Sequence, residues 1–138
     1  MSRTLCIFKP DLTGDRRATN QALLRLLAVD FVPTTLAFTA LTKAQAAKLY
    51  AAHEGQPYYK RNIEFMMSGP CIVMVLDGER AVERLRDLVG STDPDKAQPG
   101  TLRRIYGKGL PDNAVHATGS EAEVEREISI FFETEDLP

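Results

Sequence analysis

The sequence has few residues that could bind a metal ion or form a disulfide. Its 138 residues include two cysteines and two histidines. No C-x-x-C or His-x-x-x-His pattern joins them, so the chain offers no structural zinc site. Cys6 and Cys71 each lie within an apolar run of strand-like length, where a thiol behaves as a small hydrophobic side chain. We expect both to be reduced core residues.

A strong charge of one sign and long hydrophobic runs are also absent. The formal net charge is −2, so the chain lacks the positive field that attracts nucleic acid, and we expect no specific nucleic-acid partner. The first apolar run, 5–8, ends at Lys9 and is too short for a signal peptide or a membrane span. We therefore expect a cytoplasmic protein with no membrane partner, folded as one domain over residues 1–138.

The glycine-rich loops of two large nucleotide-binding classes are missing as well. The sequence contains no G-x-x-x-x-G-K-[ST] motif and no G-x-G-x-x-G motif after a strand. The first absence excludes a P-loop enzyme, and the second leaves dinucleotide binding without support.

What the sequence does contain is a regular succession of strand-like and helix-like segments. Strands are expected at 4–8, 35–41, 71–76 and near 114–116, and helices at 19–29, 42–52, 58–67, 79–89 and from 120 onward. The order β-α-β-(αα)-β-α-loop-β-α predicts an α/β chain of the α+β sandwich type. We expect a ferredoxin-like βαββαβ fold, with a four-stranded antiparallel sheet and helices on one side.

Local patterns refine three of these elements. Thr42 with Gln45, and Ser120 with Glu123, have the spacing of capping boxes, which mark helix starts. Residues 35–41 alternate, with apolar side chains on one face and threonines on the other, which predicts a half-exposed strand.

The segment 91–111 has no usable periodicity and is rich in proline and glycine, so we expect a long loop. A loop of this length inside a compact domain is commonly functional. It contains Thr92 and Arg103 and leads directly to Asn113. We therefore expect it to form part of a site.

The stretch from 113 to 127 contains the strongest candidate for chemistry. His116 follows a short apolar run, and Glu127 shares a helix face with Val124 and Phe131, which predicts that its side chain points inward. An inward carboxylate needs a partner. If the strand of His116 lies beside this helix, Glu127 accepts a hydrogen bond from one imidazole nitrogen and leaves the other free as a nucleophile. On these residues alone, a structural histidine remains the alternative.

Five motifs in this sequence resemble those of the nucleoside diphosphate kinases, in the same order and at nearly constant spacing. They are F-K-P-D at 8–11, M-x-S-G-P at 66–70, G-x-T-D-P at 90–94, P-G-T-L-R at 99–103 and N-A-V-H at 113–116. Each motif alone is weak evidence, but the five together are specific. The similarity extends from about residue 4 to residue 132.

The resemblance implies an enzyme that transfers the γ-phosphate of a nucleoside triphosphate such as ATP to a nucleoside diphosphate. The transfer would follow a ping-pong mechanism, through a phosphohistidine at His116 that Glu127 orients. The family's phosphate- and ribose-binding positions match Lys9, Tyr50, Arg86, Thr92, Arg103 and Asn113, and its base clamp matches Tyr58 and Leu110. Of these, Lys9 would also act in catalysis.

The resemblance also implies a cofactor and an assembly. Mg²⁺ would arrive with the nucleotide and be held mainly by its phosphates, because the sequence shows no paired acidic residues in a metal-binding arrangement. The family forms tetramers or hexamers built of dimers, so we expect a homo-oligomer.

Some residues depart from the family pattern. Gly119 stands where the family has an aspartate, whereas Thr118 keeps a hydroxyl group that can bond to Glu127. Two alternatives remain open at this point. One is a catalytically weak nucleotide-binding interaction module of the same fold. The other, an RNA-binding ferredoxin-like domain, needs exposed aromatic side chains on central strands, and 5–8 and 71–76 are typical of buried strands instead.

Overall fold

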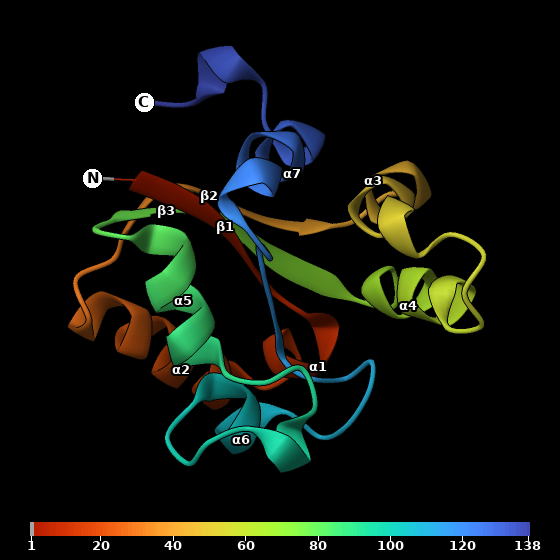
Figure 1. Ribbon diagram of the computed structural model, residues 1–138, viewed down its shortest axis with the longest axis horizontal. Coiled ribbons are helices and arrows are strands. Elements are labelled where there is room, and N and C mark those ends of the chain that lie inside the picture. Colours follow the sequence, from red (N-terminus) through yellow and green to blue (C-terminus); the bar gives the residue numbers. More distant parts are fainter. Residues whose placement is uncertain (1) are drawn as a thin grey trace.

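The computed structural model describes residues 2–138 and shows a four-stranded sheet in the order β2-β3-β1-β4 (Figure 1). Its strands are β1 (Ser2–Phe8), β2 (Val32–Ala40), β3 (Pro70–Gly78) and β4 (Val115–Ala117). All three neighbouring pairs are antiparallel. The ferredoxin-like order of elements and the antiparallel sheet are therefore confirmed.

Seven α-helices and four short 3₁₀ helices are described around this sheet. The α-helices are α1 (Pro10–Thr13), α2 (Arg16–Ala28), α3 (Lys43–Leu49), α4 (Tyr59–Met66), α5 (Ala81–Val89), α6 (Leu102–Tyr106) and α7 (Val124–Phe131). The 3₁₀ helices are η1 (Ala51–His53), η2 (Pro94–Lys96), η3 (Glu121–Glu123) and η4 (Thr134–Asp136). None of the helices in residues 2–138 combines the length and the apolar composition that crossing a bilayer requires.

Helices cover both faces of the sheet, so the expectation that they lie on one side is wrong. Cys6 and Phe8 of β1 pack in a core with α2, α5 and α6, whereas Leu5 and Ile7 pack in a second core with α3, α4 and α7. The two groups of helices lie on opposite sides of the strands in Figure 1. The reason is the continuous apolar run in β1 and β3, which places hydrophobic side chains on both faces and requires a cover for each.

The two predicted capping boxes have different outcomes. The one at Thr42 is confirmed, because its hydroxyl accepts from the N–H of Gln45 at 3.1 Å and the Gln45 side chain accepts from the Thr42 N–H at 3.0 Å. The one at Ser120 is wrong. The Glu123 carboxylate instead accepts from Arg126 Nε at 2.6 Å, and α7 starts only at Val124, after a 3₁₀ turn.

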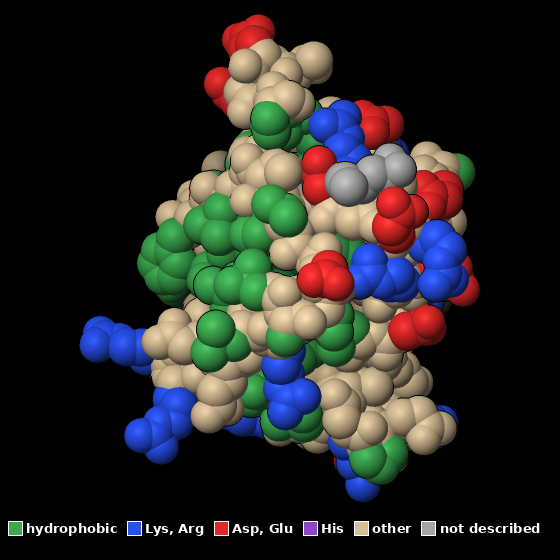
Figure 2. Space-filling view, turned by 90° about the vertical axis from the view of Figure 1, so that its left-hand side faces the viewer, with side chains coloured by type: hydrophobic (Ala, Val, Ile, Leu, Met, Phe, Trp, Pro, Cys, Tyr) green, Lys and Arg blue, Asp and Glu red, His purple; other side chains and the backbone are tan. Residues whose placement is uncertain are grey.

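The edge strand β2 exposes its apolar face in the single chain. Leu36 is 48% exposed and Phe38 is 64% exposed. Their cross-strand partners, Met74 and Ile72, belong to the core on the α2 side of the sheet, so both point to the same side as α2. We define the α2–β2 patch as these two side chains with two further exposed residues of α2, Leu24 and Leu27. Hydrophobic side chains gather on the face seen in Figure 2.

Candidate active site

A cleft of about 470 Å³ brings together residues from six separate segments of the chain. Ten of the eleven side chains predicted from the sequence line it: Lys9, Tyr50, Tyr58, Arg86, Thr92, Arg103, Leu110, Asn113, His116 and Glu127. The eleventh, Thr118, lies behind the cleft and bonds to Glu127. The sheet explains the convergence, because β4 pairs with β1 and so places His116 beside the end of β1, where Lys9 follows.

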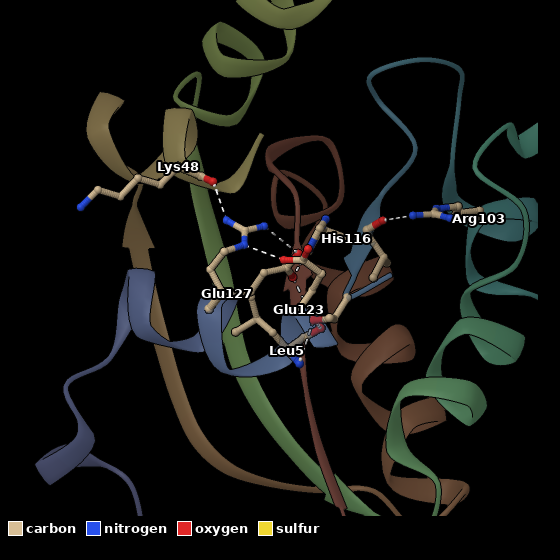
Figure 3. Close-up of polar contacts among 9 residues, drawn as sticks. Leu5, Lys48, Arg103, His116, Glu123 and Glu127 are labelled. Carbon is tan, nitrogen blue, oxygen red and sulfur yellow. Dashed lines mark hydrogen bonds and ion pairs between the residues drawn. The ribbon is translucent and has the colours of Figure 1, made fainter. Parts of the chain in front are cut away.

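His116 and Glu127 face each other from β4 and α7 (Figure 3). His116 Nε2 lies 2.8 Å from Glu127 Oε1, and the Thr118 hydroxyl donates to the same oxygen at 2.9 Å. Burial alone would raise the pKa of Glu127, but the hydrogen bond and charge of His116 outweigh it, with help from Thr118, so its pKa lies below the ordinary value. An ionised Glu127 accepts, so Nε2 carries the proton and Nδ1 keeps its lone pair.

Lys9 supplies a buried positive charge at the end of β1. Its side chain is 6% exposed, and Nζ donates to Asn113 Oδ1 at 2.6 Å and to the Pro111 carbonyl at 3.2 Å. Burial, and then the neighbouring charge of Arg103, lower its pKa to about 8. The ammonium group is therefore held by neutral acceptors, and an added anion would compensate for its burial.

Two arginines extend this positive region. Arg103 donates from Nη1 to the Gly90 carbonyl at 2.8 Å. It also donates from Nη2 to the Val115 carbonyl at 2.9 Å, the bond drawn from Arg103 in Figure 3. Burial, and then the charge of Arg86, lower its pKa to about 10, so it stays protonated at neutral pH. Arg86 is exposed and lines the cleft close to Gly119, where an added Cβ atom would lie 4.0 Å from its Nη1. The guanidinium group has room to bind a phosphate.

Asn113 is more than the turn residue that its sequence context allows. It is 2% exposed, accepts from Lys9 Nζ, and donates from Nδ2 to the Thr92 carbonyl at 2.8 Å. The side chain thus joins the start of β4 to two other walls of the cleft. Loss of the amide would leave a buried ammonium group short of an acceptor.

The outer end of the cleft contains side chains to which the sequence analysis assigned no role. His53 Nδ1 lies 3.0 Å from the Tyr58 hydroxyl, and the two ring centroids are 5.5 Å apart. Arg61 and Asn62 also line this end. The sequence did contain a signal for Arg61 and Asn62. They follow Tyr58 by three and four residues, and helical spacing places these three side chains on one face.

The arrangement suits the transfer of a phosphoryl group. An imidazole with a free nitrogen is a nucleophile, and its carboxylate partner can stabilise the positive charge that the ring gains. Lys9, Arg86 and Arg103 can stabilise the negative charge on phosphate oxygens. Among residues 2–138, no group of three or more His, Cys, Asp or Glu side chains is placed to hold a metal ion.

Comparisons with known proteins point to one family. The family model for nucleoside diphosphate kinase matches residues 2–137. The chain is 38% identical to nucleoside diphosphate kinase 1 of Protochlamydia amoebophila, covering 98% of this chain and 95% of that protein. It is 37% identical to the nucleoside diphosphate kinase of Psychromonas ingrahamii, covering 99% and 94%.

Solved structures agree with the sequence relatives. The Aquifex aeolicus nucleoside diphosphate kinase superimposes with a TM-score of 0.93 at 32% identity, covering 99% of both chains. The Halobacterium salinarum nucleoside diphosphate kinase, determined in complex with CDP, gives a TM-score of 0.93 at 34% identity and covers 99% of this chain and 91% of that chain. The similarity thus includes every element around the cleft.

Proposed function

The chain belongs to the nucleoside diphosphate kinase family, and on this basis we propose how the residues of its cleft carry out the reaction. The protein transfers the γ-phosphate of a nucleoside triphosphate to a nucleoside diphosphate. Relatives of nearly the same length carry this name, which favours an enzyme over the alternative of an interaction module without turnover. The family match and the fold likewise favour the kinase over the alternative of an RNA-binding domain.

His116 is the nucleophile of the proposed mechanism. Nδ1 attacks the γ-phosphorus of the triphosphate, a P–N bond forms, the P–O bond to the diphosphate breaks, and the diphosphate leaves. An incoming diphosphate then attacks the same phosphorus and regenerates the free ring. The observation that supports this most directly is the 2.8 Å contact of Nε2 with Glu127, because it leaves Nδ1 unprotonated within a cationic cleft.

The other cleft residues bind and orient the nucleotide. Lys9, Arg86 and Arg103 hold the phosphates, Tyr50 and Thr92 add hydroxyl donors, and Asn113 with Lys9 contacts the sugar or phosphates. Tyr58 and Leu110 clamp the base at the outer end. A relative binds CDP, and we propose that nucleoside di- and triphosphates are the partners of this cleft.

Mg²⁺ is proposed to enter with the nucleotide. Glu123 and Glu127 are the carboxylates that line the cleft among residues 2–138, and both are engaged, by Arg126 and by His116. The donor set therefore fits an ion held by phosphate oxygens rather than by a protein cage. When bound, the ion would neutralise part of the phosphate charge.

We also propose a single domain over residues 1–138 and a cytoplasmic location, where free thiols such as Cys6 and Cys71 persist.

Brief incubation with γ-labelled ATP tests the proposed function. We expect label on the protein that survives alkali and is lost in acid, as a phosphohistidine requires. Addition of unlabelled GDP should move the label into GTP. Label that survives acid, or label that GDP cannot remove, contradicts the mechanism.

Glu127→Ala is expected to slow phosphorylation of His116 by about ten- to a hundredfold while nucleotide affinity changes by less than about threefold. The reason is that the carboxylate contacts the His116 ring, whereas the phosphate binding is assigned to Lys9, Arg86 and Arg103. Single-turnover kinetics and equilibrium binding measure the two quantities separately. Glu123→Ala is the matched control, because Glu123 also lines the cleft but bonds to Arg126. Equal losses in rate and affinity would argue against an orienting role.

We propose that the α2–β2 patch joins two copies of the chain, as the dimer from which a tetramer or hexamer is built. Among residues 2–138, the edge strand β2 pairs on one side with β3 and on the other side with no strand. An open edge strand with exposed apolar side chains is typical of an interface.

Phe38→Glu is expected to shift the protein to a smaller assembly, because the charge would be buried at the contact. Light scattering coupled to size-exclusion chromatography measures the mass. Met67→Glu is the control, since Met67 is 40% exposed but lies outside the patch. An unchanged mass for Phe38→Glu would show that the patch is not the contact.

A further inference from the structure

The backbone just before His116 adopts a rare conformation. Ala114 has a φ of 73°, in the left-handed region that residues with side chains seldom occupy. The Val115 N–H donates to the Asn113 carbonyl at 2.9 Å, which closes a three-residue turn around Ala114. Turns of this positive-φ form are strained and persist only where neighbouring contacts hold them.

Two contacts from the start of the chain hold this turn. The Ala114 N–H donates to Asp11 Oδ2 at 3.0 Å, and the Ala114 carbonyl accepts from the Lys9 N–H at 2.8 Å. Asp11 lies in the first turn of α1, 103 residues away in sequence. Both backbone hydrogen-bonding groups of Ala114 are therefore fixed by the segment that follows β1.

The ionised carboxyl group of Asp11 is stabilised chiefly by the Ala114 N–H, and less by the charge of Lys9 and by its own backbone N–H. Asp11 is half-buried, and its second oxygen, Oδ1, is buried without a hydrogen-bond partner in the part of the chain that the structure describes. Burial raises the pKa of Asp11, although the Ala114 N–H lowers it in part. Burying a carboxylate with one unpaired oxygen costs free energy. The hydrogen bond to the Ala114 N–H offsets part of this cost.

The turn links two functional side chains. Asn113 precedes Ala114, and His116 follows it by two residues. Asn113 is held by Lys9 and Thr92, and His116 by Glu127. If Ala114 relaxed to an ordinary negative φ, the chain would rotate between these two side chains and could not satisfy both sets of contacts.

We propose that Asp11 is a positioning residue for phosphoryl transfer. By holding Ala114 in the strained turn, it sets the place of the His116 imidazole relative to the nucleotide bound at Asn113. Asp11 does not line the cleft, so it acts through the backbone and contacts no reacting atom. Displacement of a reacting group by a fraction of an ångström lowers the rate more than the affinity. The inference rests on the proposed function of His116.

Three variants test the proposal in the full-length protein. Asp11→Ala is expected to slow single-turnover phosphorylation of His116 by about ten- to a hundredfold, with less than about threefold loss of ADP affinity. Asp11→Asn keeps an acceptor for the Ala114 N–H and should stay within about threefold of the wild-type rate. Ala114→Gly, added to Asp11→Ala, removes the side chain that makes the left-handed conformation strained and should recover at least about fivefold.

The outcomes separate positioning from general stability. A loss of folded protein alone would lower the labelling rate and the amount of bound ADP together, whereas a displaced imidazole lowers the rate alone. Recovery of the rate in the double variant, at unchanged ADP affinity, supports the proposal. A wild-type rate in Asp11→Ala overturns it, and so do equal losses in Asp11→Ala and Asp11→Asn with no recovery. If Asp11→Ala fails to fold, the phosphorylation rates of three other variants decide. These variants are Asp11→Asn, Ala114→Gly and the double variant Asp11→Asn/Ala114→Gly. In that comparison, a loss of more than tenfold in Asp11→Asn that glycine does not restore counts against the proposal. Absence of label in the wild type would instead contradict the proposed function.

Discussion

Replacing His116 with alanine is expected to abolish the phosphoenzyme and to lower turnover by at least about a thousandfold. The ring supplies the atom that bonds to phosphorus, and the other cleft side chains offer no substitute within reach of Glu127. Nucleotide binding should persist within a few-fold, because the phosphate-binding cations remain. Labelling with γ-labelled ATP and a coupled turnover assay measure the two losses.

The sequence provides its own control, since it contains one other histidine. His53 also lines the cleft, at the outer end, where its ring bonds to Tyr58. His53→Ala should therefore retain the label and most of the turnover. Label of undiminished intensity on His116→Ala would disprove the assignment of the nucleophile.

Replacing Lys9 with methionine should lower kcat/KM by about a hundredfold without a matching loss of stability. The buried ammonium group is placed to stabilise phosphate charge, and its hydrogen-bond partners in the protein are neutral acceptors. Its removal relieves the cost of burying a charge and leaves the Asn113 amide oxygen with one partner fewer. Thermal unfolding of the variant should therefore stay within about 5 °C of the wild type. A variant with full activity would exclude a catalytic role for Lys9.

The pH dependence offers a second measure of the same group. Lys9 has a pKa of about 8 in the free protein and an ordinary value of 10.5. Above pH 8 the free enzyme loses this charge, so kcat/KM should fall, and Lys9→Met should lack that limb. Stability should change in the opposite sense. Between pH 8 and 10.5 the unfolded chain binds more protons, so raising the pH stabilises the wild type relative to the variant. Parallel pH profiles for the two proteins would contradict this.

Much of the fold follows from local patterns, because the apolar runs of β1 and β3 and the cap at Thr42 are properties of adjacent residues. The local predictions failed where another side chain competed for a hydrogen bond or where an element was too short to show a periodic pattern. Arg126 takes the Glu123 carboxylate that the cap at Ser120 needed. The five-residue helix α6 is too short for periodicity to reveal, and its signal is a single N-cap, Thr101, which bonds to Arg104 N–H.

Site residues could be predicted where they lie in recognisable motifs. Contacts that arise only when distant strands pair could not. The resemblance predicted the side chains that line the cleft, and helix spacing predicted that Glu127 points inward. The contact of Glu127 with His116 was expected on the condition that their helix and strand lie side by side. The contact of Asp11 with Ala114 joins residues 103 positions apart. No sequence pattern specifies it, because it arises from the pairing of β1 with β4.

The size of the cleft has a consequence for metabolism. A volume of about 470 Å³ suits one nucleotide at a time, which agrees with the proposed mechanism, in which donor and acceptor take turns in the same place. The enzyme then has no separate recognition of the two and no built-in direction. Surplus diphosphate would bind in the cleft while His116 is unphosphorylated and would block the triphosphate donor. The turnover rate therefore falls when triphosphates are scarce. In a cell, such a protein equalises the energy charge of different nucleotide pools rather than filling any one of them.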